Sequence, residues 1–76
     1  MESACVKILD LHDVERHDIL FKVEKFLTDN FRDLPVKVIT GYSKYNIDKV
    51  NNLATKYNLK THKERWVNGG AWIVTN

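Results

Sequence analysis

An Asp and a His stand two residues apart at the end of the first predicted strand, in the tetrapeptide Leu9-Asp10-Leu11-His12. Side chains alternate across a strand, so the two leucines can enter the core while Asp10 and His12 share the opposite face. An Asp beside a His can orient the imidazole and raise its pKa, which is what a general acid-base pair requires. The alternative is that both polar residues only satisfy backbone groups at the strand end.

Two strands and the helix between them account for the first half of the chain. Alternating apolar residues predict a strand over 5–11, and β-branched residues predict a second strand over 36–40. Between them, Asp13 is the expected N-cap of a helix with Glu15 in its first turn. The predicted apolar face of this helix consists of Ile19, Leu20, Val23, Phe26, Leu27 and Phe31.

A second helix and a β-hairpin complete the predicted domain. Asn46 is the expected helix cap, and Asn58 can end the helix in a left-handed turn. Asn68-Gly69-Gly70 then joins strands over 61–67 and 71–75, because Asn-Gly favours a type I′ turn. The predicted fold class is therefore α/β, a two-layer sandwich of order β-α-β-α-β-β with a four-stranded mixed sheet and both helices on one face. Residues 1–76 are expected to form a single domain.

The predicted topology brings two polar segments to one edge of the sheet. Strands joined by a helix should be parallel with a right-handed crossover, and such sheets bind ligands beyond the carboxyl ends of their strands. Asp10 and His12 end the first strand, and Thr40-Gly41 end the second. The two segments therefore converge on one candidate site.

Charge and aromatic residues extend this candidate site into the second half of the chain. Residues 34–76 hold seven Lys or Arg against two Asp or Glu, whereas residues 1–33 hold five against eight. Tyr42 and Tyr45 flank Lys44, a mixture that suits stacking on unpaired bases, and Lys60, Lys63 and Arg65 extend the basic surface along the third strand. Two alternatives stay open, namely that the charge asymmetry has no partner and that one Tyr covers the second helix. Trp66 and Trp72 are expected in the core or as cross-strand partners in the hairpin.

The sequence argues against metal, cofactor and membrane chemistry. The single cysteine, Cys5, excludes a disulfide framework and indicates a small buried residue in a reducing compartment. His12, His17 and His62 follow no metal-ligand spacing, and the three glycines form no nucleotide cradle. No apolar run approaches membrane length, so we expect a cytoplasmic protein without a bound cofactor or metal.

Three motifs in this order resemble the small MutS-related (Smr) domain family over nearly the whole chain. Leu9-Asp10-Leu11-His12 resembles the family's opening motif, Val38-Ile39-Thr40-Gly41 its middle motif, and Gly69-Gly70-Ala71 its closing hairpin. The chain departs from the family at Asp13, where the family prefers Gly, and at Tyr42-Ser43, where it prefers Lys-Gly. Tyr45-Asn46 occupies the place of the family's His-Ser.

The resemblance implies nucleic-acid binding and endonucleolytic cleavage. It assigns Asp10 and His12 as the catalytic pair and Thr40-Gly41 as part of the substrate loop. We therefore expect a nucleic-acid-binding endonuclease, with RNA favoured over DNA, His12 as the acid-base and Lys44 with the Gly41 backbone as phosphate contacts. The alternative is an inactive Smr-like module that binds RNA, DNA, a ribosomal surface or another protein. A monomer is expected, and so short a domain suggests a compact genome such as that of a virus.

Overall fold

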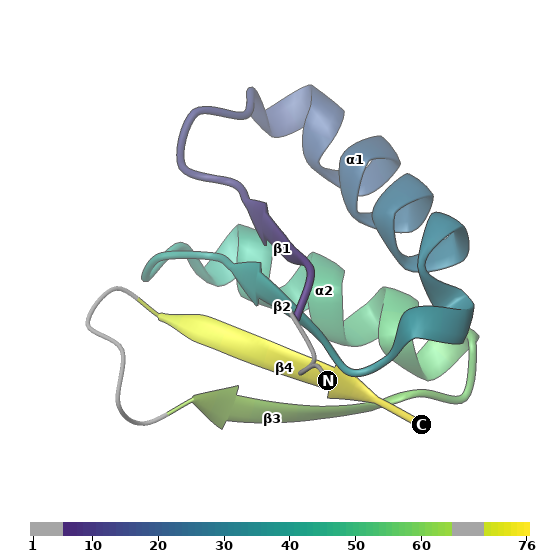
Figure 1. Ribbon diagram of the computed structural model, residues 1–76. Helices are drawn as coiled ribbons and strands as arrows, with labels where there is room; N and C mark the ends of the chain where they lie inside the picture. The colour runs from purple at the N-terminus through teal and green to yellow at the C-terminus, as the bar shows by residue number, and fades with distance from the viewer. Residues whose placement is uncertain (1–5, 65–69) are drawn as a thin grey trace.

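The computed structural model describes residues 6–64 and 70–76. A mixed sheet carries two α-helices on one face, which confirms the predicted α/β two-layer architecture (Figure 1). The elements in chain order are β1 (Ile8–Asp10), α1 (Arg16–Asp29), the short 3-10 helix η1 (Phe31–Asp33), β2 (Val36–Ile39), α2 (Lys44–Lys56), β3 (Lys60–Glu64) and β4 (Ala71–Thr75). Among these described residues, no helix is long and apolar enough to cross a membrane.

The strand order in the sheet is β1-β2-β4-β3. β1 and β2 are parallel, as predicted, with Asp10 paired to Ile39, and the other two pairs are antiparallel. The hairpin between β3 and β4 is confirmed, whereas its predicted Asn-Gly turn and Trp66 lie outside the described residues, as does Cys5. Because each helix follows one of the two parallel strands, both helices begin at the edge where β1 and β2 end.

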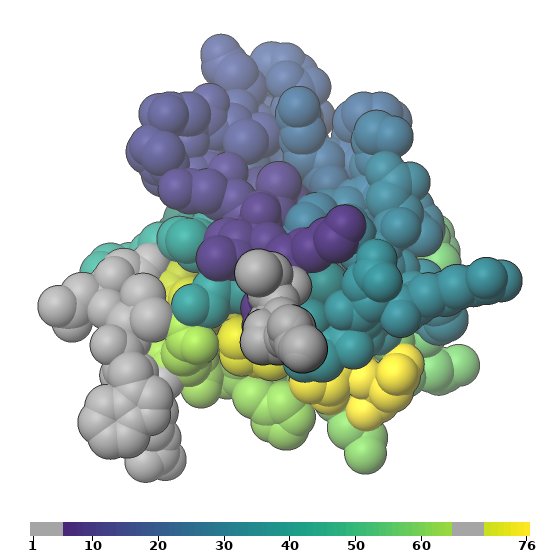
Figure 2. Space-filling view, viewed as in Figure 1, coloured from purple at the N-terminus to yellow at the C-terminus, as the bar shows by residue number. Residues whose placement is uncertain are grey.

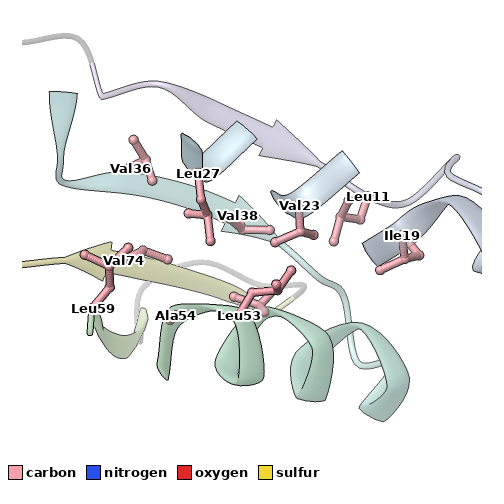
Figure 3. Close-up of a cluster of buried hydrophobic side chains, with 11 residues drawn as sticks. Leu11, Ile19, Val23, Leu27, Val36, Val38, Leu53, Ala54, Leu59 and Val74 are labelled. Atoms are coloured by element: carbon pink, nitrogen blue, oxygen red, sulfur yellow. The ribbon is translucent and has the colours of Figure 1, made fainter. Parts of the chain in front are cut away.

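The core lies between the sheet and the helices (Figure 3). Leu11 from the end of β1 joins it, Leu9 packs against it, and Asp10 between them is exposed. This alternation places the Asp10 side chain on the face away from the helices. Burial of one large apolar side chain stabilises the fold by about 1.5–3 kcal/mol. The largest fully buried side chains among the described residues are Leu11, Ile19, Val23, Leu27, Val36, Val38, Val50 and Val74.

The start of α1 differs from the sequence prediction. Its N-cap is Glu15, whose side chain makes no capping hydrogen bond, and Asp13 instead contacts His12. Two residues of the predicted apolar face, Leu20 and Phe31, are about half exposed. Phe31 lies beyond α1, in η1, so it does not continue the helical stripe.

The start of α2 differs from the prediction in the other direction, because this helix begins earlier than predicted. Ser43 is the N-cap, and its hydroxyl accepts a hydrogen bond from the backbone N–H of Asn46 at 3.3 Å. The predicted cap, Asn46, lies within the first turn, and its side-chain amide donates to the carbonyl of Thr40 at 3.4 Å. The predicted left-handed turn is confirmed, because Asn58 has a φ of 60°.

Candidate functional site

The candidate site lies at the edge of the sheet where β1 and β2 end. Leu11, directly after β1, donates its backbone N–H to the carbonyl of Ile39, the last residue of β2, at 3.0 Å. The loops that follow both strands therefore begin side by side, as the sequence predicts, at the left of Figure 1. The loop after β1 is exposed in the space-filling view, at the upper left of Figure 2.

His12 is held between two carboxylates in the loop after β1. Its Nδ1 lies 2.9 Å from Asp10 Oδ1 and its Nε2 lies 2.9 Å from Asp13 Oδ2. The same Asp10 oxygen accepts the backbone N–H of His12 at 3.0 Å. The His12 side chain remains 68% exposed and that of Asp13 86%, so substrate can reach this group from solvent.

This geometry favours the protonated form of His12. A neutral imidazole has a single N–H, whereas two carboxylates around the ring are satisfied only when both nitrogens carry protons. The hydrogen bond to Asp10 and the charges of Asp10 and Asp13 raise the pKa of His12. Conversely, the backbone N–H and then the imidazole of His12 lower the pKa of Asp10. The pair is therefore better suited to donate a proton than to accept one.

Hydrogen bonds from Thr40 and Gly41 to Gly70 join the end of β2 to the start of β4; we call this contact the joint. The carbonyl of Gly70 accepts the backbone N–H of Thr40 at 2.9 Å, the N–H of Gly41 at 3.1 Å and the Thr40 hydroxyl at 3.0 Å. Thr40 is 2% exposed. The Gly41 amide, which the sequence predicts as a phosphate contact, therefore donates to Gly70 in this structure, and the Thr40 hydroxyl is buried beside it.

Tyr42, Lys44 and Tyr45 follow this joint but differ in their surroundings. Tyr42 is 78% exposed and Lys44, the first residue of α2, is also exposed. Tyr45 is partly buried, packs against the core and has two cations near its ring, Arg16 and Lys49. Tyr42 thus retains the surface that base stacking needs, whereas Tyr45 is the Tyr that covers the second helix.

The basic residues predicted along β3 do not share one surface. Thr61 donates its hydroxyl to Asn51 of α2, so Thr61 and Lys63 lie on the helix side of β3, and Lys60 lies on the other side. Lys60 is also paired with Thr75, at the end of the sheet remote from Gly70, and Arg65 lies outside the described residues. Lys60 and Lys63 therefore lie on opposite faces of β3, and their part in nucleic-acid binding stays a prediction.

Sequence reasoning missed Arg16 and Lys49, because each stands on a helix far from the other in sequence. The guanidinium carbon of Arg16 lies 4.7 Å from the centroid of the Tyr45 ring, and Lys49 Nζ lies 5.1 Å from it. The sequence does contain one signal for Lys49, which stands four residues after Tyr45 and so on the same side of α2. Nothing in the sequence alone places Arg16 there.

Elsewhere in the described chain, we examined a groove, possible metal-ligand groups and the two other histidines for a second candidate site. A groove of about 450 Å³ between the helices is lined by Phe21, Glu24, Lys25, Thr28, Asp29 and Tyr57, none of which is a predicted site residue. Within residues 6–64 and 70–76, no group of three His, Cys, Asp or Glu side chains is placed to hold a metal ion. His17 and His62 lie outside the cluster around His12, on α1 and β3.

Comparison of the chain with protein-family models, with curated proteins and with solved structures finds no match.

Proposed function

We propose that this chain is an Smr-like domain that binds single-stranded RNA at the edge where β1 and β2 end, and that His12 acts there as a general acid in strand cleavage. The observation that carries the proposal is the exposed His12 held by Asp10 at 2.9 Å, at the sheet edge where β2 also ends and leads through Tyr42 to Lys44, the first residue of α2. The first two sequence motifs that resemble the Smr family end at this edge, and the described part of the third, Gly70-Ala71, leads into β4.

The arrangement supports one half of an RNA-cleavage reaction. When a ribose 2′-hydroxyl attacks the adjacent phosphorus, the P–O bond to the 5′-oxygen breaks and that oxygen needs a proton. The imidazolium of His12 can donate the proton from Nε2 once the exposed Asp13 carboxylate moves aside, while Asp10 holds the ring through Nδ1. The 2′-hydroxyl proton leaves to water in this scheme. No metal ion is required for either transfer.

Binding without cleavage is the second candidate function. The Gly41 and Thr40 amides donate to Gly70, so these amides are not available to stabilise charge on a reacting phosphate. Charge stabilisation is usually the largest contribution to such catalysis, and its loss would leave an RNA-binding surface with little activity. The two functions share the same binding edge and differ in the role of His12.

Cleavage assays distinguish RNA cleavage from RNA binding without cleavage. They compare wild type, His12→Ala and Asp10→Asn on a labelled single-stranded RNA. The matched control is His17→Ala, because His17 is also exposed and lies 3.5 Å from a carboxylate, that of Asp18, but stands on α1. If His12 is the acid, His12→Ala slows cleavage by about 10²- to 10⁴-fold and Asp10→Asn slows it less, whereas His17→Ala does not. Equal cleavage by all four proteins contradicts the catalytic assignment, and binding without cleavage by wild type leaves the second candidate.

A further inference from the structure

We propose that Arg16 and Lys49, gathered around the ring of Tyr45, form a binding site for a backbone phosphate of the RNA next to the one at His12. This inference rests on the proposed RNA binding at the same edge. Arg16 opens α1 and Tyr45 lies in the first turn of α2, so the site bridges the beginnings of both helices. Arg16 comes from the acidic first half of the chain, which charge patterning alone leaves out of the RNA surface.

Arg16 and Lys49 differ from the other cations in the described chain because both lie at the same aromatic ring, and no carboxylate forms an ion pair with either of them. Lys7, Lys25, Lys37 and Lys56 each form an ion pair with an Asp or Glu. Within residues 6–64 and 70–76, neither Arg16 nor Lys49 forms such a pair, and both lie close to one ring. Two positive charges held at one ring repel each other, and a bound anion that both can reach offsets that repulsion.

The stacked arrangement prepares Arg16 for a phosphate. A guanidinium over an aromatic ring keeps its N–H donors in its own plane, where they can form paired hydrogen bonds to phosphate oxygens. The ring also restricts the side chain before binding, which reduces the entropy lost on contact. Lys49 adds a second positive charge from the next turn of α2.

The position of the cluster favours a phosphate of a chain that also passes His12. Arg16 follows His12 by four residues, and Lys44 immediately precedes Tyr45. The Asp13 carboxylate, in the loop between His12 and Arg16, contacts His12. Both helices direct their N-terminal ends to this edge, and their dipoles favour negative charge there. A single RNA strand can therefore contact His12, Lys44 and the Arg16–Lys49 pair in succession.

Salt-dependent RNA binding tests the assignment. We expect Arg16→Ala and Lys49→Ala each to weaken binding of a labelled single-stranded RNA and to lower the log-log salt slope by about 0.7, and the double variant to lower it by about twice that. Arg16→Lys keeps the charge and should retain the slope while losing affinity several-fold. Lys22→Ala is the matched control on α1, with an exposed cation that forms no ion pair among the described residues, and should behave as wild type. An unchanged slope in the double variant overturns the assignment.

A second measurement separates this inference from the proposed function. If the wild type binds no RNA, the function fails, but a phosphate site at Arg16 can still be detected with inorganic pyrophosphate. The side-chain Nε–Hε NMR signal of Arg16 should then shift on titration, while that of Arg32, exposed on η1, stays in place. No shift at Arg16, or equal shifts at both residues, overturns the site whatever the RNA result.

Discussion

The carbonyl oxygen of Gly70 accepts hydrogen bonds from both the backbone N–H and the hydroxyl of Thr40, at 2.9 and 3.0 Å. This contact joins the start of β4 to the end of β2, directly before the loop that carries Tyr42 and Lys44. It therefore fixes where that loop leaves the sheet.

Thr40→Val should destabilise the fold by about 1 kcal/mol, because it removes a buried hydrogen bond while nearly preserving shape. Chemical denaturation measures the change. Thr55→Val is the control: its hydroxyl donates to Asn51 O at 3.0 Å on the exposed side of α2 and should matter little. Equal losses in both variants would show that the Thr40 hydroxyl has no special role in the joint.

Gly70→Ala should cost more stability than Gly41→Ala. Both glycines have a left-handed φ, 71° and 67°, which an alanine adopts at a cost of about 1–2 kcal/mol. A Cβ on Gly70 would in addition lie 2.1 Å from the carbonyl oxygen of Gly41, so the backbone must shift. Thermal unfolding of the two variants checks the order. A Gly70→Ala protein as stable as wild type would contradict the close approach.

The imidazole of His12 should titrate above pH 6.5 in an NMR titration. Asp10→Asn should lower the pKa of His12, because the largest cause of its raised value is the hydrogen bond to Asp10. An unchanged His12 pKa in Asp10→Asn would show that the contact does not persist in solution.

The same pair should give stability a defined pH dependence. The pKa of His12 is higher in the folded protein than its value near 6.5 in the unfolded chain. Its contribution to stability is therefore complete below pH 6.5 and is lost as the pH rises through the pKa of His12 in the folded protein. The pKa of Asp10 is lower in the folded protein than its value near 3.8 in the unfolded chain. Its contribution to stability is therefore complete above pH 3.8 and is lost as the pH falls through the pKa of Asp10 in the folded protein. The difference in unfolding free energy between wild type and Asp10→Asn should therefore be largest between these limits. A difference that does not vary with pH would contradict the linkage.

Tyr42→Ala should weaken single-stranded RNA binding by about 1–3 kcal/mol, the usual contribution of one stacked base. Tyr42→Phe keeps the ring and is the matched control, so it should bind nearly as wild type does. Duplex binding should change less, since paired bases offer no free face to an exposed side chain. If Ala and Phe variants bind RNA equally, the Tyr42 ring does not stack on a base.

The fold and the place of the site follow from the sequence because they depend on local patterns. Apolar periodicity identifies both helices, and the helix between the first two strands makes those strands parallel. Parallel strands then bring Asp10 and His12 to the same edge as Thr40 and Gly41, as the structure confirms.

The contacts within the site could not be predicted, because they depend on tertiary placement. Asp13 fits a helix-cap pattern equally well, and only the loop path after β1 brings it to His12. Arg16 reaches Tyr45 because two helices begin side by side, which no local pattern encodes. The sequence alone leaves the Gly41 amide available for phosphate. In the structure, the β3–β4 hairpin brings the carbonyl of Gly70 next to Thr40 and Gly41, and the Gly41 amide donates to it.

The most direct test of the proposed RNA-binding edge is an NMR titration of the backbone and side-chain signals with an unlabelled single-stranded RNA. We predict the largest shifts at His12, Arg16, Tyr42, Lys44 and Lys49, and small shifts at Lys60 and in the groove lined by Phe21 and Tyr57. Shifts confined to β3 or to that groove, with His12 and Lys44 unmoved, would contradict the proposed interface.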